Sequence, residues 1–399
     1  MAKFLIERRL RGFICTTAHP VGCSRNVEEQ VAKALKNKFT GPRSVLVIGA
    51  STGYGLASRI AAAFGAGADT LGVFFERPAD GDRTASAGWY NTVAFEELAR
   101  RSGLLAASVN GDAFSDDIKE KTIELIGKKF KKIDLVIYSL AAPRRTDRSG
   151  VTHKSVLKPI GKPFVGKTVN LDHGTVTEVT IDPATDEEIA GTVAVMGGED
   201  WELWMGALAS AGVLAKGAKT VAYGYIGPEL TWPIYRDGTI GRAKAHLEST
   251  VDKINAILRP MGGEAHIAIN KAVVTQASAA IPVVPLYISI LFRLMKSMGT
   301  HETCIDQMLR LFRDRIYGKN LQPGAIDGCG RFRVDDLEMD RNLQSEIAKL
   351  WPLVTSENIR RLTDFDGYQS DFLNLFGFDV HGVDYNEAVE TDLPLKELP

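Results

Sequence analysis

The sequence predicts a doubly wound, Rossmann-type α/β fold in which a parallel sheet carries helices on both faces. Six apolar runs lack the polar alternation of a half-exposed strand, and helical stretches separate most of them. The first run also leads directly into a glycine-rich turn and an alanine-rich helix, as in nucleotide-binding βαβ units. The expected strands lie at residues 44–50, 70–76, 104–112, 133–142, 219–227 and 266–274.

The turn after the first strand reads "VLVIGASTGYGLASR" and places Gly49, Gly53 and Gly55 between strand and helix. Glycines there allow a tight turn and bring backbone N–H groups and the helix N-terminus close to a pyrophosphate. The spacing G-x-x-x-G-x-G differs from G-x-G-x-x-G and is typical of the short-chain dehydrogenase/reductase superfamily. Glycine-rich turns also occur for packing alone, but the flanking strand and helix favour dinucleotide binding.

Candidate ligand contacts follow the ends of the next strands, where ligands bind in open α/β sheets. Glu76 ends the second strand and can accept hydrogen bonds from the adenosine ribose, which favours NAD over NADP. The adjacent Arg77 could instead receive a 2′-phosphate. Asp112 follows the third strand, and Leu140 and Ala141 follow the fourth. A solvated strand end, turn chemistry and core packing are the alternative roles for these positions.

Three further segments elaborate the predicted sheet. Residues 150–200 alternate Thr and Val around Asp-His-Gly and Asp-Pro turn signals, which predicts one or two inserted β-hairpins. Residues 277–298 form an apolar helix that falls short of the ~20 apolar residues of a membrane span, so it either packs in the core or covers an apolar substrate. Residues 300–399 look mostly helical, and residues 1–399 are expected to form a single elaborated domain.

A tyrosine and a lysine in "YRDGTIGRAK" form the candidate catalytic pair. Tyr235 precedes an amphipathic helix expected over residues 239–260, and Lys244 lies on that helix. Eight residues separate the two, which would place them on opposite sides of a continuous helix, so a break at Asp237-Gly238 is expected to let Tyr235 fold back. An adjacent ammonium is expected to lower the pKa of the phenol and make it a better donor. The alternatives are a half-buried tyrosine and a solvated lysine.

Composition excludes several classes of function. The 48 basic and 49 acidic side chains give a net charge of -1, without the basic excess of a nucleic-acid-binding protein. The four cysteines show no C-x-x-C pairing, which predicts free thiols in a reducing compartment. The first residues lack the apolar stretch of a signal peptide, so we expect a cytoplasmic protein without stable membrane insertion. The seven histidines are scattered, and no metal site is expected.

Long stretches of the chain resemble the FabV-type enoyl-acyl-carrier-protein reductases and the related trans-2-enoyl-CoA reductases. The resemblance runs over essentially the whole chain, and the eight residues between Tyr235 and Lys244 match the family's separation of its catalytic pair. The stretches that carry it include "RGFICTTAHPVGC", "GASTGYGLASR", "GVFFERP", "GWYN", "NGDAFSD", "VIYSLAAPRR", "AVMGGEDWELW", "KAVVTQASAAIP" and "LTDFDGYQSDFLNLFGF".

The resemblance implies a role for each matching residue. Tyr235 is implied to be the catalytic donor, Lys244 to assist it and hold the nicotinamide end, and Tyr225 to touch the substrate. The residues implied to contact NADH are Gly49, Ala50, Ser51, Thr52, Gly53, Tyr54, Phe75, Glu76, Asp112, Ala113, Leu140, Ala141, Lys244, Val273, Val274 and Thr275.

The implied activity is NADH-dependent reduction of the trans-2 double bond of an enoyl thioester in fatty acid biosynthesis, carried on acyl-carrier protein or on CoA. Hydride goes to the β-carbon, and Tyr235 stabilises the resulting enolate. The family also favours a monomer. Two other readings stay open at this point: a carbonyl reductase that uses the same pair of residues, and a non-catalytic NAD-sensing protein. Within the apolar segment, Tyr287 and Met295 either line the substrate site or pack in the core.

Overall fold

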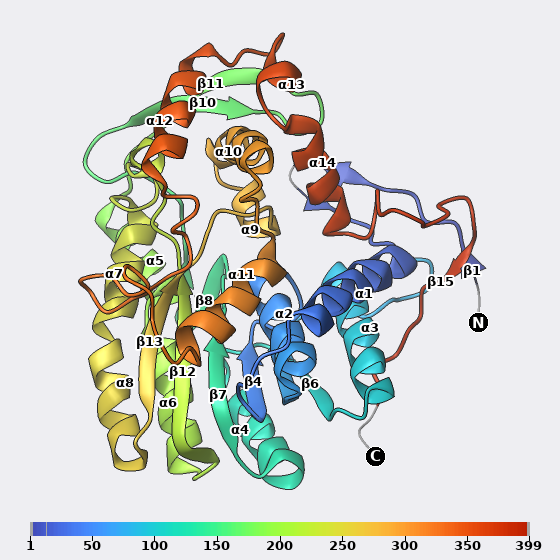
Figure 1. The fold of residues 1–399 in the computed structure, drawn as a ribbon, viewed down its shortest axis with the longest axis vertical. Coiled ribbons are helices and arrows are strands. Elements are labelled where there is room, and N and C mark those ends of the chain that lie inside the picture. The colour runs from blue at the N-terminus through green and yellow to red at the C-terminus, as the bar shows by residue number, and fades with distance from the viewer. Residues whose placement is uncertain (1–2, 13, 397–399) are drawn as a thin grey trace.

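The computed structural model describes residues 3–12 and 14–396, and its centre is a seven-stranded, all-parallel sheet (Figure 1). The strand order is β14-β13-β12-β7-β4-β5-β6. Because the order reverses direction at β4, the sheet is doubly wound, which confirms the predicted fold class. The strands are β4 (Ser44–Ile48), β5 (Asp69–Phe74), β6 (Ala106–Asn110), β7 (Ile133–Tyr138), β12 (Leu214–Gly224), β13 (Glu264–Ile269) and β14 (Phe332–Arg333).

Helices cover both faces of the sheet, and each face has its own apolar core. One core includes Val27, Leu56, Phe95 and Met308. They come from α1 (Pro20–Lys36), α2 (Gly53–Ile60), α3 (Ala87–Arg101) and α11 (Cys304–Arg310). The other core includes Ile118, Trp204, Leu247 and Ile254. They come from α4 (Asp116–Leu125), α6 (Glu199–Ser210), α7 (Thr239–Ser249) and α8 (Val251–Leu258). Covering both faces explains why the strands are continuous apolar runs.

Two expected helices are interrupted. The helix expected over 239–260 divides at Thr250 into α7 and α8, and Arg259–Met261 forms a 3-10 turn after it. The apolar helix expected over 277–298 divides into α9 (Gln276–Ala279) and α10 (Val284–Met298). Val283, at the N-cap of α10, has φ +76°, a conformation unfavourable for a β-branched side chain.

The insertion contains hairpins and a helix. β8 (Arg144–Thr146) pairs with β9 (Thr152–Lys154), and β10 (Phe164–Val169) pairs with β11 (Val176–Ile181). The residues after them were expected to belong to the same hairpins, but they form α5 (Asp186–Met196). Thr185 and Glu188 make a capping box there, which is a helix signal in the sequence.

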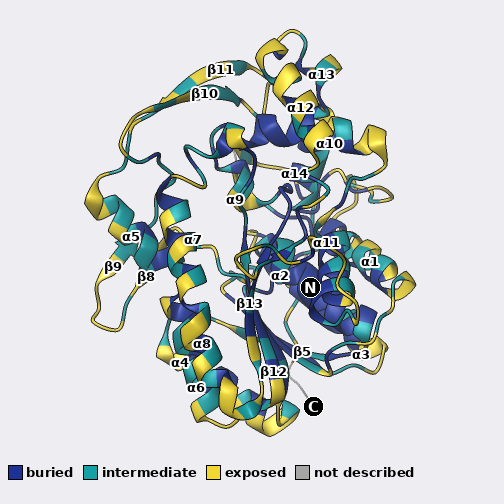
Figure 2. Cartoon of the chain, turned by 60° about the vertical axis from the view of Figure 1, so that its left-hand side comes forward, coloured by how far each residue is buried: buried dark blue, intermediate teal, exposed yellow. Residues whose placement is uncertain are grey.

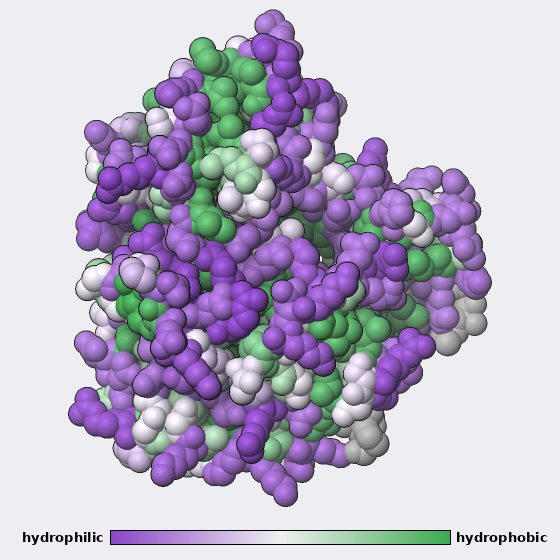
Figure 3. Space-filling view, viewed as in Figure 1, coloured by the Kyte–Doolittle hydropathy of each residue, from purple (hydrophilic) through white to green (hydrophobic). Residues whose placement is uncertain are grey.

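A third apolar core lies above the sheet, around α10 and beneath the hairpin β10–β11 (Figure 1). It joins α10 to α12 (Arg341–Leu350), α13 (Ile359–Leu362) and α14 (Phe365–Asn374). Figure 2 shows most of α10 buried, and Figure 3 shows apolar side chains gathered on the surface around the hairpin. No helix in the described part of the chain is long and apolar enough to cross a bilayer.

Two further pairs of short strands lie outside the central sheet, and one of them joins the two ends of the chain. β1 (Lys3–Phe4) pairs with β15 (Val389–Glu390), and β2 (Leu10–Arg11) pairs with β3 (Ile14–Cys15). After residue 300, α11, α12, α13 and α14 are separated by long non-helical stretches, so the region is helical only in part, and it also adds β14 to the central sheet. Residues 397–399 of the predicted helical extension lie outside the described residues.

Candidate active site

The glycine turn between β4 and α2 is a place of close approach between backbone segments. Gly49 has φ +87°, and a Cβ added at Gly55 would lie 1.8 Å from the Gly49 carbonyl oxygen, so both positions require glycine. The N-terminus of α2 has no side-chain cap at Thr52 and no acidic residue in its first turn. Its free N–H groups and the positive end of its dipole favour an anion, so the turn fits a dinucleotide pyrophosphate.

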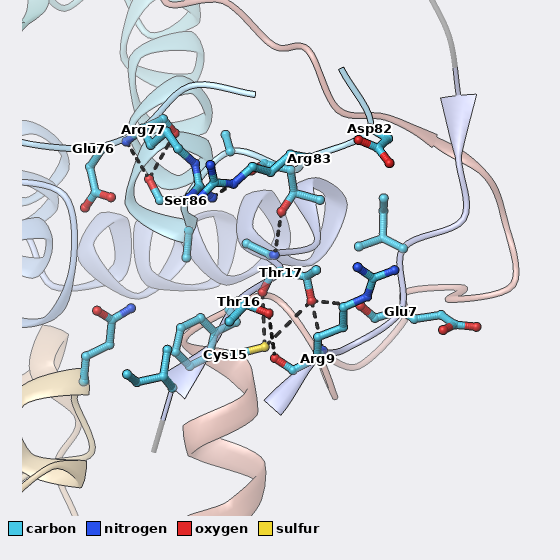
Figure 4. Close-up of a pocket in the computed structure, with 18 of the residues that line it drawn as sticks. Glu7, Arg9, Cys15, Thr16, Thr17, Glu76, Arg77, Asp82, Arg83 and Ser86 are labelled. Atoms are coloured by element: carbon cyan, nitrogen blue, oxygen red, sulfur yellow. Dashed lines mark hydrogen bonds between the residues drawn. The ribbon is translucent and has the colours of Figure 1, made fainter. Parts of the chain in front are cut away.

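Glu76 lies just beyond β5, beside the glycine turn and the start of α3. Its Oε1 accepts a hydrogen bond of 2.6 Å from Ser51 Oγ, and its main chain makes two hydrogen bonds of 2.8 Å with the Asn110 side chain. Glu76 borders a cavity of about 730 Å³ that Arg77 and Arg83 also line (Figure 4). A carboxylate held in this way can accept from ribose hydroxyls and repels a 2′-phosphate.

A second cavity, of about 560 Å³, lies at the carboxyl ends of β7, β12 and β13, and we call it the tyrosine cavity. The expected site residues that line it are Tyr54, Leu140, Ala141, Tyr225, Tyr235, Lys244, Val273 and Thr275. Thr52, Gly53 and Val274 border a third cavity of about 350 Å³, which Val273 also lines. Gly49, Ala50 and Ser51 lie in the glycine turn directly after β4 and line neither cavity.

The remaining expected contacts lie beyond β5 and β6 and line none of these three cavities. Phe75 is 77% exposed directly after β5, so its ring presents a flat apolar surface. Asp112 Oδ1 accepts a hydrogen bond of 3.0 Å from the Phe114 amide, and the Ala113 carbonyl accepts one of 3.0 Å from Trp204 Nε1. Asp112 thus has the turn role that was one of its alternatives, and its contact with NADH stays a prediction.

Tyr235 reaches the tyrosine cavity because the turn that carries it packs tightly on α7. Its amide donates to the Thr231 carbonyl at 3.0 Å, and the Asp237 amide donates to the Trp232 carbonyl at 2.8 Å. A Cβ added at Gly241 would lie 1.7 Å from the Arg236 carbonyl oxygen. The missing side chain at residue 241 therefore lets the turn lie against α7, which begins at Thr239 just after the expected Asp-Gly break.

The ionisation of Tyr235 differs from the expectation. Burial raises the pKa of its phenol to about 12, where an adjacent ammonium was expected to lower it. The reason is that Lys244 Nζ donates a hydrogen bond of 2.9 Å to the Tyr223 carbonyl oxygen. Among the described residues the Tyr235 hydroxyl has no hydrogen-bond partner. Tyr235 is therefore a neutral phenol whose proton is free to point at a ligand.

Lys244 is expected to give the enzyme an alkaline limit. Burial lowers its pKa to about 8, and Glu248 opposes the shift. The charged form is thus lost as pH rises through about 8, and kcat/KM for NADH, which reports on the free enzyme, is expected to fall there. Burial also lowers the pKa of Lys271, in the same cavity, to about 8.

The Lys244→Arg variant tests whether Lys244 or Lys271 sets the alkaline limit. Arginine keeps its charge at all accessible pH values, so the fall is expected to move well above pH 8 in a kcat/KM profile of this variant. A fall that stays near pH 8 would assign the limit to Lys271 and contradict the assignment to Lys244.

Two buried residues of the tyrosine cavity, Asn270 and Lys271, were not predicted from the sequence. Asn270 is 2% exposed, and neither its Oδ1 nor its Nδ2 has a hydrogen-bond partner among the described residues. Because an unpaired buried amide is destabilising, the site fits a ligand with both a donor and an acceptor, such as the nicotinamide carboxamide. Lys271 donates from Nζ to the Ala272 carbonyl at 2.8 Å. The residues "AIN" at the end of this strand give no sequence signal that the Asn270 amide is unpaired or that Lys271 is buried.

The apolar segment lines the tyrosine cavity only along its first part. Ala277, Ile281 and Val284 face the cavity, at α9 and the start of α10. Tyr287 and Met295 are fully buried and do not line it, which favours the core role for both.

Three family models match consecutive parts of the chain. The NAD(P)H binding domain of trans-2-enoyl-CoA reductase matches residues 5–81. The trans-2-enoyl-CoA reductase catalytic region matches residues 83–317 and so contains Tyr235 and Lys244. The enoyl reductase FAD binding domain matches residues 326–389.

The last of these names implies a flavin, but the residues of that segment do not fit one. Asp340 caps the N-terminus of α12 and accepts hydrogen bonds from the amides of Asn342 and Leu343. Asp364 and Asp366 stand at the N-terminus of α14. These carboxylates occupy the helix ends where a pyrophosphate would bind, and the helices bury their apolar sides against α10. We therefore derive no step through a flavin.

Relatives resemble the chain from end to end. Enoyl-[acyl-carrier-protein] reductase [NADH] from Opitutus terrae is 56% identical, with 98% of this chain and 100% of the relative aligned. Trans-2-enoyl-CoA reductase [NADH] from Ruminiclostridium cellulolyticum is 54% identical, with 99% and 100% aligned. The solved trans-2-enoyl-CoA reductase from Treponema denticola, in complex with NAD, has a TM-score of 0.93 at 47% identity, with 98% and 100% covered. The chain belongs to the trans-2-enoyl-CoA reductase family, which includes the FabV-type enoyl-acyl-carrier-protein reductases.

Proposed function

We propose that the protein is an NADH-dependent enoyl thioester reductase of fatty acid biosynthesis. It reduces the trans-2 double bond of acyl chains carried on acyl-carrier protein or on CoA. One observation carries the proposal: the unpaired hydroxyl of Tyr235 shares a cavity with Lys244, beside a glycine turn that fits a dinucleotide.

The residues of the tyrosine cavity suit this chemistry. When bound, NADH supplies a hydride to the β-carbon. The electron pair of the double bond then moves towards the thioester oxygen and gives an enolate, and protonation of the α-carbon yields the saturated thioester. Tyr235, neutral because its pKa is about 12, donates a hydrogen bond to that oxygen as negative charge develops. A single donor of this kind stabilises the transition state by about 3–4 kcal/mol.

The remaining roles belong to the same proposal, and the position of each residue supports its role. Lys244 and Val273 to Thr275 hold the nicotinamide end, and Tyr225 contacts the substrate, because these residues line the tyrosine cavity or, for Val274, the adjoining third cavity that Val273 also lines. Glu76 holds the adenosine ribose. Leu140 and Ala141 form the cavity wall after β7, and α9 with the start of α10 covers the acyl chain and excludes water.

The test compares two substrates with NADH. Crotonyl-CoA carries a trans-2 double bond, whereas acetoacetyl-CoA carries a ketone on the same carrier. Oxidation of NADH with crotonyl-CoA supports the proposal. Turnover of acetoacetyl-CoA alone would identify a carbonyl reductase, and turnover of neither, with NADH still bound, would identify a binding protein.

Replacing Glu76 is expected to relax the preference for NADH. Two like charges about 4 Å apart repel by about 4 kcal/mol at an effective dielectric constant near 20, and Arg77 stands next to Glu76 to receive a phosphate. In Glu76→Ala we therefore expect kcat/KM for NADPH to rise at least about tenfold relative to that for NADH. Asp82→Ala, in the same cavity, is the control and is expected to keep the preference of the parent. An equal shift in both variants would contradict the specific role of Glu76.

We further propose that the enzyme acts as a monomer. Tyr225, Tyr235 and Lys244 meet in one cavity within a single chain, so a second copy is not needed to bring them together. Light scattering measured on the active fraction tests this, and activity confined to a dimer would contradict it.

A further inference from the structure

A buried carboxylate lies directly behind the tyrosine cavity. Glu338 follows β14 in the chain and is fully buried. Its Oε1 accepts hydrogen bonds from the hydroxyls of Tyr225 at 2.9 Å and Tyr287 at 2.7 Å. Its Oε2 accepts one from the Ala272 amide at 2.7 Å. One side chain therefore joins the residue after β12, helix α10 and the segment after β13.

Several buried groups determine the charge of Glu338. Burial raises the pKa of the Glu338 carboxyl group above its ordinary value. The Lys271 ammonium, the Tyr287 hydroxyl and the Ala272 amide oppose this shift without cancelling it, and Asp335 adds to it. Three donors converge on the two oxygens, an arrangement that an ionised carboxylate satisfies as an acceptor. Gln344 Nε2 donates to the Tyr287 oxygen at 3.2 Å, so the proton of Tyr287 is also directed at Glu338.

The direction of these hydrogen bonds decides what Tyr225 can offer a ligand. A phenol has one proton, and that of Tyr225 is engaged by Glu338, so its oxygen presents only lone pairs to the cavity. The hydroxyl proton of Tyr235, in contrast, is free to be donated, since it has no partner among the described residues. The two rings pack edge to face, with centroids 4.9 Å apart and an interplanar angle of 85°. Holding Tyr225 therefore also holds one flank of Tyr235.

We propose that Glu338 is a positioning residue that engages the proton of Tyr225, so that Tyr235 alone of these two phenols donates to the substrate oxygen. The inference rests on the proposed function, because it concerns which phenol meets the charge on the thioester. Glu338 touches neither substrate nor cofactor and acts through Tyr225. Its bond to the Ala272 amide also steadies the segment that begins at Val273.

Glu338→Gln tests the inference because an amide cannot accept from all three donors. If the amide oxygen serves Ala272, the NH₂ group faces the phenols, and the proton of Tyr225 is released into the cavity. The loss of kcat on Tyr235→Phe, about 10²–10³-fold in the parent, is then expected to shrink to about tenfold in the Glu338→Gln background. Tyr225→Phe added to that double variant is expected to restore the full loss.

Tyr287→Phe is the matched control, because it removes a second hydroxyl from Glu338 and leaves the Tyr225 bond in place. It is expected to leave the size of the Tyr235→Phe loss unchanged. A purely structural role of Glu338 predicts the same loss in all three backgrounds, and that result would overturn the inference.

A second measurement does not depend on the folding of Glu338→Gln. If Tyr225 cannot donate, adding Tyr225→Phe to Tyr235→Phe removes a substrate contact and is expected to raise KM for crotonyl-CoA, while kcat falls by less than about tenfold. A further tenfold fall would show that Tyr225 already donates, and would overturn the inference. A parent enzyme without activity on crotonyl-CoA would instead remove the proposed function, so the two failures are distinguishable.

Discussion

Tyr235→Phe is expected to lower kcat for crotonyl-CoA by about 10²–10³-fold, the usual loss when one oxyanion donor is removed. The phenyl ring can keep its contact with Tyr225, so the fold and the KM for NADH are expected to change little. The pKa of about 12 adds a condition: the parent phenol stays neutral over the whole accessible pH range, and the defect is therefore expected to be independent of pH from 6 to 9. Assays of NADH oxidation at several pH values measure the loss of kcat and its dependence on pH.

Tyr317→Phe is the matched control for this change. Its hydroxyl also lacks a hydrogen-bond partner among the described residues, but its ring packs on the far core around α11 and does not line the tyrosine cavity. We expect unchanged kcat and KM. Parent-like turnover in Tyr235→Phe would contradict the catalytic assignment, and an equal loss in Tyr317→Phe would show that the assay responds to stability.

Gly241→Ala is expected to be the most damaging single-methyl change near the site. The new Cβ would lie 1.7 Å from the Arg236 carbonyl oxygen and 2.9 Å from that of Tyr235, so the turn must move off α7. Overpacking of this kind destabilises a protein by about 1–3 kcal/mol, and a displacement of about 1 Å at a catalytic group can reduce the rate about 10²-fold. We expect both a lower melting temperature and a fall in kcat of that order.

Gly206→Ala provides the comparison for a methyl group added to a helix. A Cβ at Gly206, within α6, meets no atom within 4 Å. Alanine is a better helix former than glycine, so this variant is expected to gain about 0.5–1 kcal/mol with unchanged turnover. Gly241→Ala with normal kcat and a normal melting temperature would show that the turn does not need its close approach to α7.

The sheet could be predicted because parallel strands covered on both faces must be continuous apolar runs. The predicted runs extend up to five residues too far at their carboxyl ends, as in β13, which ends at Ile269 instead of residue 274. There the chain leaves the sheet to form the site, while its composition stays apolar. β14 consists of two residues and is too short to leave a pattern. Helix α5 was missed although Thr185 and Glu188 signal it, because Thr and Val recur on both sides of its first turns, at residues 176–180 and 192–195.

For the site, the sequence predicted the Tyr235–Lys244 pair but not its electrostatics. Spacing shows that a turn must separate the two residues. It does not show that Lys244 Nζ points to the Tyr223 carbonyl or that burial dominates the pKa of both groups. Glu338 and Asn270 could not be found at all, because their partners are distant in the chain or absent. Their roles depend on tertiary contacts that no local pattern encodes.

The position of the tyrosine cavity has a consequence for how activity is acquired during refolding. Tyr223 packs with the sheet, whereas Tyr225 and Tyr235 pack against the separate core around α10, to which residues near both ends of the chain contribute. Proteins of this size fold through intermediates in which one compact region precedes another. An intermediate with a complete sheet but without the packed core around α10 would show native secondary structure and no turnover. The rate at which turnover returns during refolding therefore reports when the core around α10 packs onto the sheet.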